Sequence, residues 1–383
     1  MDNQSPAHGG VLYFDNILDA NIGCVVDIFS CAFSCTGRFI SYEKWLITDS
    51  YHCVALSDDP KYIHADRIDQ VAETSMDSHF TGLSRLKLYF ALSRTPHGLL
   101  DMCTPAFGAL LWLGQFPPVY VILLGLITTF AGYTAVYALN DVIDYEADKE
   151  KATIGGFSNS QSDLDGLIVR HPMAQGLLSF KQGLIWTLVW GSVALIGAYI
   201  LNPVCVLIFL TGCSLEAVYC MLWRVSPFRT IVSGAVKTSG AIAAVFAVDP
   251  DPSWSYVAFL FLTLFFWEIG GQNIPNDWVD LNEDKRFKAQ TIPVCFGLQV
   301  SRLIVLVTIA LSLCLNVLVF YYSRVDYVVF CVIISMVMGG YLLLLPALKL
   351  FRTMQVSDAM ALFNKASYYP PALFMIVLVA LMI

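Results

Sequence analysis

Charged residues are scarce in this chain of 383 amino acids: Asp, Glu, Lys and Arg together make up 14% of it. Soluble globular domains carry about 25% charged residues and about 45–50% apolar residues, whereas the hydrophobic fraction here is 57%. The shortage of charge excludes an ordinary soluble enzyme. An aromatic content of 13% excludes an intrinsically disordered chain. The remaining class is an integral membrane protein that crosses the bilayer several times.

Positive charge is especially scarce in the N-terminal segment. Residues 1–80 contain 12 acidic and 4 basic residues, which excludes electrostatic binding of this segment to nucleic acid or to anionic lipid. The first ten residues lack the basic and apolar regions of a signal peptide, and no Arg-rich transit peptide is visible. We expect residues 1–84 to form a small cytoplasmic extension, whose role the sequence does not indicate.

Cysteines are present, 11 in all, but their spacing supports no disulfide framework. Most fall inside apolar stretches, where thiols usually act as small hydrophobic side chains. A zinc site in the N-terminal segment is the alternative, although the spacing matches no standard zinc motif. Its ligands would be Cys24, Cys31, Cys35, His52 and Cys53.

Long apolar runs dominate the rest of the chain. Nine of them are close to the twenty residues that a membrane-spanning helix needs. They cover residues 97–114, 117–139, 180–200, 203–223, 230–248, 254–273, 300–322, 326–347 and 367–383. The sequence therefore predicts an all-α fold, a polytopic bundle of nine transmembrane helices within residues 85–383.

The distribution of basic residues predicts the orientation of this bundle. If the N-terminus is inside, the inner loops receive nearly all Lys and Arg residues, and the outer loops receive only Arg324. This agrees with the positive-inside rule. It places the two long polar loops, 140–179 and 274–299, on the cytoplasmic face. The acidic N-terminus without a targeting signal favours the plasma membrane of a prokaryote.

Each of these two loops begins with the same acidic pattern. Residues 140–149 read NDVIDYEADK and residues 276–285 read NDWVDLNEDK, so both follow N-D-x-[VI]-D-x-x-x-D-K. In a helix, positions i, i+4 and i+8 share one face. We therefore expect two stripes of oxygen-bearing side chains, one in each motif. Their members are Asn140, Asp144, Asp148, Asn276, Asp280 and Asp284.

Clustered carboxylates at the edge of a bilayer need a positive partner. Carboxylate and amide oxygens are the ligands that Mg²⁺ prefers, and Mg²⁺ commonly shares them with substrate phosphates. Solvated loop acids are the simplest alternative, but two copies of one ten-residue pattern on the same face disfavour it. A cation-transport path is the other alternative, and it calls for acids near the middle of the membrane.

Basic residues accompany the acids on the same face, although each alone is more often a membrane anchor. Acids and bases around Mg²⁺ form a site for a diphosphate, and the apolar surroundings favour a lipid that carries it. The candidate diphosphate-binding residues are Arg94, Lys149, Lys151, Arg170, Arg224, Lys285 and Lys288.

At these residues the sequence resembles the UbiA superfamily of intramembrane prenyltransferases, of the 4-hydroxybenzoate polyprenyltransferase type. The family motif N-x-x-x-D-x-x-x-D matches Asn140, Asp144 and Asp148, and its second motif matches Asp280 and Asp284. The stretch 288–297, KAQTIPVCFG, is similar to the family's tail after the second motif. The stretch 93–97, SRTPH, is similar to the entry of its first helix.

The resemblance implies a nine-helix fold and Mg²⁺ held by the two motifs against an isoprenyl diphosphate. It implies transfer of the prenyl group to a small acceptor, expected to be aromatic, with release of diphosphate. We expect quinone or related lipid biosynthesis. The implied metal ligands are Asn140, Asp144, Asp148, Asp277, Asp280 and Asp284, while Asn276 joins the catalytic set. Helix-end capping is the alternative role of Asp277.

The sequence departs from the family pattern in two places. The family's Y-x-x-x-K after helix four has Trp223 in the lysine position, with Arg224 one place later. The segment 170–176, RHPMAQG, is reached after a longer loop than the family's R-P-x-x-S-G. The usual roles of these family residues are therefore not assigned to single residues of this chain.

Three charged residues inside the spans leave alternatives open. Glu216 and Lys237 lie within membrane spans, where charged residues usually belong to a functional site. The alternative is that they form a structural ion pair with each other. Glu268 either lines the site or forms a hydrogen bond with a polar group of a neighbouring helix. The alternative functions are a prenyltransferase with a tetrapyrrole or non-aromatic acceptor and, in a different class, a cation or ion transporter.

Overall fold

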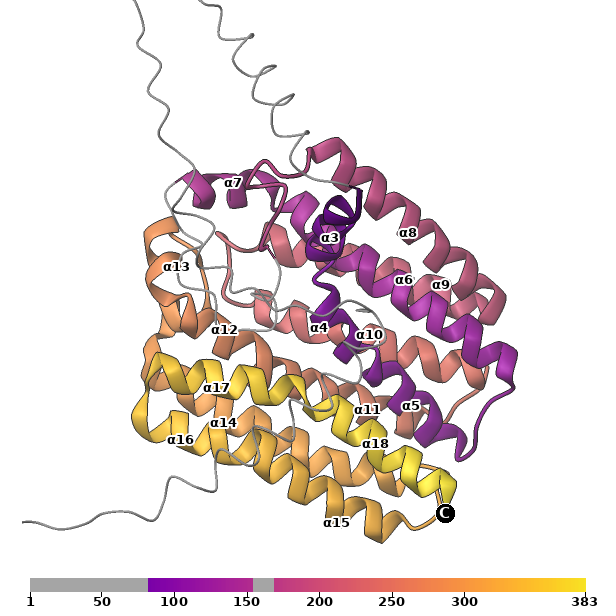
Figure 1. Cartoon of the computed structure of the whole chain (residues 1–383). Helices are drawn as coiled ribbons and strands as arrows, with labels where there is room; N and C mark the ends of the chain where they lie inside the picture. Colours follow the sequence, from indigo (N-terminus) through magenta and orange to yellow (C-terminus); the bar gives the residue numbers. More distant parts are fainter. Residues whose placement is uncertain (1–81, 154–168) are drawn as a thin grey trace, which may run out of the picture. The chain divides into compact units, whose positions relative to one another are not determined.

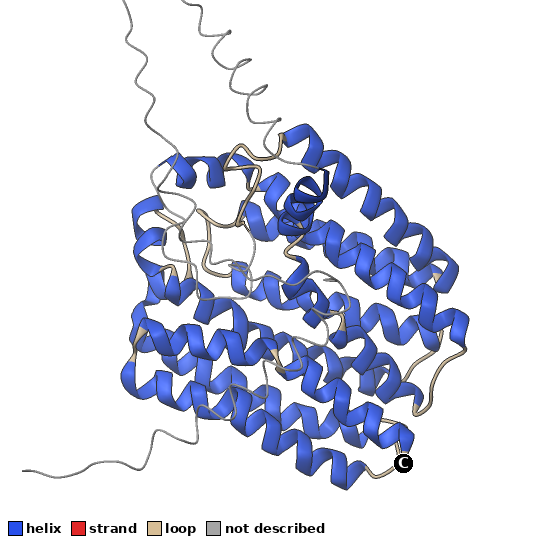
Figure 2. Cartoon of the chain, in the orientation of Figure 1, coloured by secondary structure: helices blue, strands red, loops and turns tan. Residues whose placement is uncertain are grey.

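The computed structural model describes residues 82–153 and 169–383 of the chain. The expected N-terminal extension up to residue 81, including its possible zinc ligands, lies outside these residues. Within the described ranges every regular element is a helix (Figure 2). The expected all-α class is therefore confirmed.

The helices follow one another with short connections (Figure 1). In chain order they are α3 (Gly82–Leu92), α4 (Thr95–Asp101), α5 (Cys103–Leu113), α6 (Val119–Ile143), α7 (Tyr145–Thr153), α8 (Phe180–Leu201), α9 (Pro203–Met221), α10 (Arg229–Val248), α11 (Trp254–Trp267), the π-helical segment η3 (Glu268–Asn273), α12 (Ile274–Val279), α13 (Leu281–Phe287), α14 (Ile292–Tyr321), α15 (Val328–Gly339), the π-helical segment η4 (Gly340–Leu344), α16 (Leu345–Thr353), α17 (Val356–Ser367) and α18 (Tyr369–Met382).

Eight helical stretches in the described residues are long and apolar enough to cross a membrane. The first expected run, 97–114, is divided between α4 and α5 at Met102, so it does not count among them. The last span begins at Val356, earlier than the apolar run 367–383 predicts, because α17 and α18 continue one another. The multispanning architecture is thus confirmed, with eight candidate spans in the described residues and a first expected run that is divided between two helices.

Large apolar side chains cover the outer faces of these helices. On α6 Leu123 is 57% exposed, and on α8 Leu188 is 59% exposed. Contiguous apolar surface of this kind is unfavourable in water, whereas lipid chains contact it readily. The helices therefore present the surface of an integral membrane protein.

Local sequence signals set the ends of the helices near the second and third spans. Ser179 caps α8 by accepting a hydrogen bond from the Gln182 backbone N–H at 3.3 Å, and the Gln182 side chain accepts one from the Ser179 N–H at 2.9 Å. This reciprocal pair is a capping box. Asn202 then ends α8 and caps α9, where Pro203 takes the first helical position. A single residue thus reverses the chain.

Two groups of helices are joined by α10. Helix α10 packs against α5, α9 and α11, and α5 also packs against α18. On one side α6 packs against α8 and α9, and on the other α11 packs against α14. Because α10 contacts both groups, the space beside it is bounded by helices from both.

Candidate active site

Both acidic motifs have the same local structure, in which the helix bends at the middle aspartate. Helix α6 ends before Asp144 and α7 starts after it, just as α12 ends before Asp280 and α13 starts after it. The two aspartates have nearly equal backbone angles, φ −84° and ψ 4° against φ −87° and ψ 8°. The sequence predicts a stripe on one helix; in the structure two helices share each stripe.

The bend leaves the i to i+4 backbone bonding intact. The Asp144 N–H donates to the Asn140 carbonyl at 2.9 Å, and the Asp148 N–H donates to the Asp144 carbonyl at 2.8 Å. The second motif repeats these bonds between Asn276, Asp280 and Asp284, at 3.1 and 2.8 Å. The first, fifth and ninth residues of each motif therefore remain neighbours.

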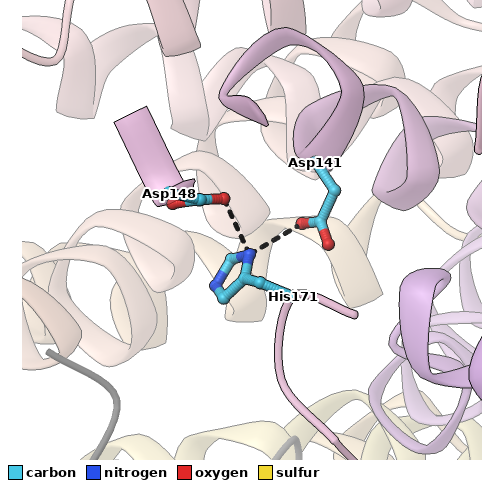
Figure 3. A group of neighbouring side chains, drawn as sticks. All are labelled: Asp141, Asp148 and His171. Carbon is cyan, nitrogen blue, oxygen red and sulfur yellow. Dashed lines mark ion pairs between the residues drawn. The ribbon is translucent and has the colours of Figure 1, made fainter. Parts of the chain in front are cut away.

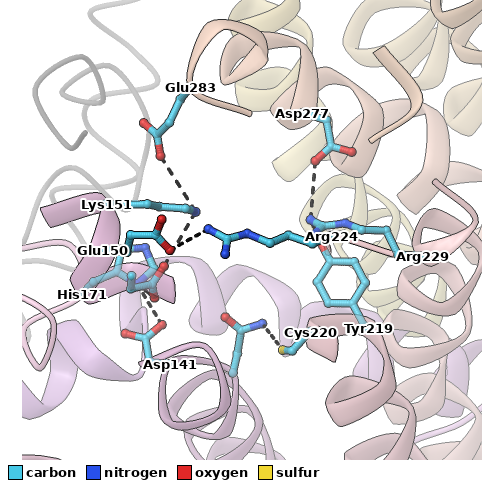
Figure 4. A network of polar contacts seen from close by, with 12 residues as sticks. Asp141, Glu150, Lys151, His171, Tyr219, Cys220, Arg224, Arg229, Asp277 and Glu283 are labelled. Atoms are coloured by element: carbon cyan, nitrogen blue, oxygen red, sulfur yellow. Dashed lines mark hydrogen bonds and ion pairs between the residues drawn. The ribbon is translucent and has the colours of Figure 1, made fainter. Parts of the chain in front are cut away.

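The ends of the two motifs meet at one cation. Helices α7 and α13 lie at the same end of the bundle (Figure 1). Lys151 Nζ lies 3.7 Å from Asp148 Oδ1 and 3.8 Å from Glu283 Oε1, so a single ammonium group joins the first motif to the second (Figure 4). It also lies 4.3 Å from the ring centroid of Trp223, the residue that replaces the family's lysine.

The start of the first motif is held by a guanidinium from the break between α3 and α4. Arg94 Nη2 donates to Asn140 Oδ1 and to Asp141 Oδ1, both at 3.2 Å. Arg94 adopts a left-handed backbone, φ 44° and ψ 44°, which is uncommon for a residue other than glycine and is often found where function demands it. Asn140 Nδ2 in turn donates to Glu216 Oε1 at 2.6 Å.

His171 enters between two acids of the first motif. Its Nδ1 lies 2.8 Å from Asp148 Oδ2 and 3.2 Å from Asp141 Oδ1 (Figure 3). Burial lowers the pKa of His171, but the charges of Asp141 and Asp148 outweigh this and raise it to about 9. The imidazole is therefore protonated at neutral pH. Like Arg94, His171 has a positive φ, 45°.

An arginine that the sequence did not predict as a site residue contacts the second motif. Arg229 Nη2 lies 3.5 Å from Asp277 Oδ1 and donates to the Tyr219 hydroxyl at 2.7 Å (Figure 4). Tyr219 also accepts a hydrogen bond from Asn273 Nδ2 at 3.1 Å. Arg229 begins α10, five residues after Arg224, and brings a buried cation to the second motif.

The acids outside the spans differ in how well their charge is compensated. Burial raises the pKa of Asp144, of Asp280 and of Asp284. Burial acts in the same direction on Asp148, but the ion pairs with His171 and Lys151 bring its pKa below the ordinary value. The positive charge around Asp144, Asp280 and Asp284 therefore does not offset the effect of burial on their pKa values.

This donor set fits a hard divalent cation. Carboxylate and amide oxygens are available from both motifs, and an added cation would compensate the buried Asp284 and the half-buried Asp144 and Asp280. Ligand atoms of Asp141, Asp148 and His171 also lie within 4.8 Å of one another, and His171 would have to lose its proton to share a metal ion with the two acids. Asp277, one of the expected ligands, instead faces Arg229.

The expected diphosphate-binding residues fall into two sets. Arg94, Lys151 and Arg170 are half-buried among the acids, and Arg170 interacts electrostatically with Asp280. The others lie on the surface: Arg224 pairs with the exposed Glu150 at 2.7 Å, and three lysines are exposed. These lysines are Lys149, Lys285 and Lys288.

A cavity of about 540 Å³ leads from this acidic end into the membrane part. Its polar end is lined by Arg94, Asn140, Glu216 and Asn276, and its far end by apolar side chains such as Phe116. Glycine and alanine residues of α6, α9 and α10 line the stretch between. The cavity therefore offers a polar end and a mostly apolar wall, and Lys237 and Glu268 also line it.

The fold and the site together define a class of protein. It is a polytopic membrane protein with two acid-rich motifs at the mouth of a largely apolar cavity. The family model described as the UbiA prenyltransferase family matches residues 102–369. The chain belongs to this family and is an intramembrane enzyme that transfers prenyl groups. The expected family, fold and enzyme class are confirmed.

Curated relatives of this chain include two prenyl-transferring enzymes. Over 216 residues it is 24% identical to the digeranylgeranylglyceryl phosphate synthase of Thermococcus sibiricus, which covers 56% of this chain and 71% of the relative. Over 189 residues it is 25% identical to the protoheme IX farnesyltransferase of Ruthia magnifica, covering 48% of this chain and 60% of the relative.

Solved structures share the fold at low sequence identity. A digeranylgeranylglyceryl phosphate synthase matches with a TM-score of 0.57 and 16% identity, over 78% of this chain and 99% of the other. A UbiA homologue from Archaeoglobus fulgidus, bound to GPP and Mg²⁺, matches with a TM-score of 0.58 and 14% identity, over 77% of this chain and 99% of the other. These likenesses establish the fold.

Proposed function

We propose that this enzyme transfers the prenyl group of an isoprenyl diphosphate to a small, hydroxylated or otherwise electron-rich acceptor, with Mg²⁺ as cofactor and diphosphate as the second product. An aromatic acceptor is the leading candidate. The two curated relatives are named for a glyceryl phosphate and a haem product, so both acceptor classes are the alternatives to test.

The observation that carries this proposal is the polarity of the cavity. Its polar end is lined by the first residue of each motif, Asn140 and Asn276, and most of the wall beyond it is apolar. A molecule with a diphosphate head and a prenyl tail matches both parts at once. The structural relative from Archaeoglobus fulgidus is itself bound to GPP and Mg²⁺.

Mg²⁺ would be held by carboxylates of both motifs, with Asp144, Asp148, Asp280 and Asp284 as first candidates. Asn140 and Asn276 are the amide candidates, although Arg94 and Glu216 already bond the Asn140 side chain. When bound, the metal supplies positive charge that stabilises the leaving diphosphate. Asp277 is the weakest metal candidate because Arg229 faces it.

The basic residues near the acids give the site its second source of positive charge. Arg94, Lys151 and Arg170 are positioned to bind diphosphate oxygens, because they are half-buried beside the motifs. Arg229 supports the second motif through Asp277. As the allylic C–O bond breaks, these groups stabilise the charge that develops on the diphosphate, and the apolar wall excludes water from the carbocation.

The wider organisation follows from the sequence pattern. We propose that residues 85–383 form the catalytic membrane domain and that residues 1–84 form an extension to it. The positive-inside pattern supports an active site on the cytoplasmic face with the N-terminus inside. A prokaryotic plasma membrane is the compartment that the sequence favours.

The direct test is release of diphosphate from geranylgeranyl diphosphate by the purified enzyme, with Mg²⁺ and with excess EDTA. Shorter and longer isoprenyl diphosphates serve as further donors. We expect release that depends on Mg²⁺. If no donor yields diphosphate, the proposed function is wrong and ion flux across vesicles becomes the next measurement.

A further inference from the structure

A second polar cluster lies in the cavity, beside the start of the first acidic motif, because Arg94 lies 5.8 Å from the ring centroid of Tyr137. Lys237 Nζ of α10 donates to Asp101 Oδ2 of α4 at 2.6 Å and to the Tyr137 hydroxyl of α6 at 2.9 Å. The Tyr137 hydroxyl donates to Asp101, and His97 Nε2 lies 3.8 Å from Asp101 Oδ1. Lys237, Tyr137 and His97 line the cavity, while Asp101 lies behind them.

Stability alone does not explain why these charges are buried. Apolar residues that pack well stabilise an interior at least as well as a buried ion pair does, and ionisable residues inside a membrane generally mark a functional site. Lys237 and Asp101 together carry no net charge. The cluster therefore offers hydrogen-bond donors to a molecule in the cavity without repelling a nearby carbocation.

Glu268 faces the same space from a π-helical turn. Its Oε1 accepts a hydrogen bond from Ser233 Oγ at 2.8 Å, whereas its buried Oε2 has no partner among the described residues. The side chain is 6% exposed, lines the cavity and interacts electrostatically with Lys237. Irregular π-helical turns often occur at functional sites because they re-aim side chains.

Other unsatisfied polar atoms lie in the wall beside Glu268. The Tyr133 hydroxyl and Asn273 Oδ1 are buried and lack hydrogen-bond partners among the described residues, and both residues line the cavity. A buried polar group without a partner costs free energy. Three such atoms around one cavity indicate that a polar molecule completes their bonding.

We propose that Glu268 is the base that takes the proton released by the acceptor, and that Lys237 binds the acceptor's hydroxyl oxygen. Asp101 and Tyr137 are positioning residues that hold Lys237. This rests on the proposed function and assigns the acceptor to a chemical class, the hydroxylated aromatic molecules. His97 and the two tyrosines give the cavity wall the aromatic character that such a ring prefers.

The step balances without a further reactant. The allylic C–O bond breaks and its electron pair leaves with the diphosphate. A ring carbon beside the hydroxyl forms the new C–C bond, while the hydroxyl proton passes to Glu268 Oε2. The ring proton at the new bond then moves to the oxygen by tautomerisation, which restores the aromatic ring, and Glu268 passes the hydroxyl proton to the leaving diphosphate.

Glu268→Gln tests the base, because the amide keeps the shape and cannot take the proton. Prenylated product and diphosphate release are measured separately, with geranylgeranyl diphosphate as donor and 4-hydroxybenzoate as acceptor. We expect transfer to fall by about 100-fold or more, with the KM for the donor within about twofold of wild type. Asp251→Asn, an exposed outer-loop acid, is the charge-matched control and keeps transfer within about twofold.

Lys237 is tested by a paired change, because a single change leaves Asp101 unpaired. The double variant Asp101→Asn/Lys237→Met removes both charges together. We expect the KM for 4-hydroxybenzoate to rise by about 10-fold or more while the KM for the donor stays unchanged. Lys237→Arg recovers part of the loss, since it keeps a cationic donor beside Asp101.

Acceptor probes decide between the remaining outcomes. The panel holds 4-hydroxybenzoate, benzoate without the hydroxyl, a geranylgeranylglyceryl phosphate and protohaem. Transfer to 4-hydroxybenzoate but not to benzoate supports the proposal. Diphosphate release with transfer only to another probe, or to none, overturns it, as does full transfer by Glu268→Gln. Absence of diphosphate release from every donor overturns the proposed function itself, and this inference with it.

Discussion

Removing Lys237 alone should destabilise the protein strongly. In Lys237→Met the Asp101 carboxylate keeps, within residues 82–153 and 169–383, the Tyr137 hydroxyl and the nearby His97 as partners, and its side chain is 4% exposed. Breaking a buried ion pair by deleting one partner costs about 3–5 kcal/mol. Such a loss is a large fraction of the total stability of about 5–15 kcal/mol that is typical of proteins.

The double variant Asp101→Asn/Lys237→Met provides the comparison. Because it leaves no unpaired charge, its free energy of unfolding should lie within about 1 kcal/mol of the wild-type value. The two single changes are then strongly non-additive. Equilibrium unfolding in mixed detergent micelles, followed by tryptophan fluorescence, measures all three variants. Equal losses in the single and double variants would refute the reasoning, because they would show that packing, not charge pairing, sets the cost.

Three further predictions concern the acidic end and the helix ends. Lys151→Gln should weaken donor binding by about 10-fold or more, whereas the exposed Lys149→Gln should change it by less than about twofold, as donor KM values would report. Arg229→Gln leaves Asp277 buried without its cation and should lower the free energy of unfolding by about 3 kcal/mol. The double variant Arg229→Gln/Asp277→Asn should regain most of this loss in unfolding titrations. If it regains none, Arg229 and Asp277 do not form a stabilising ion pair. Ser179→Ala removes the cap of α8 and should lower the free energy of unfolding by about 1 kcal/mol, with no change in catalysis.

The membrane fold was largely predictable because apolar runs and basic loops report it directly. The predicted helices differ from the observed ones where the chain bends locally. The run 97–114 contains Asp101, and the chain divides there into α4 and α5. The stripes of the two motifs bend at Asp144 and Asp280. A periodicity of 3.6 residues cannot reveal a bend that keeps the i to i+4 bonding.

The site was predictable only where residues lie close in sequence. The echo between the two motifs revealed their acids, and the structure joins their ends at Lys151. The sequence did not reveal which residues of distant helices would contact the charged residues of the site. Lys237 and Glu216, which the sequence allows to pair, instead bond Asp101 and Asn140, and the contact between Arg229 and Asp277 spans 48 positions of the chain. Only the three-dimensional packing of α4, α6, α9 and α10 decides such pairs.

One measurement tests most directly whether the paired motifs bind and activate an isoprenyl diphosphate. Diphosphate release from geranylgeranyl diphosphate is compared among wild type, Asp144→Asn, Asp280→Asn and the exposed control Asp251→Asn, with Mg²⁺ and with EDTA. We expect release by the wild type and the control with Mg²⁺ only, and a loss of about 100-fold or more in each motif variant. Release that persists in both motif variants, or in EDTA, would contradict a donor site built from the two motifs.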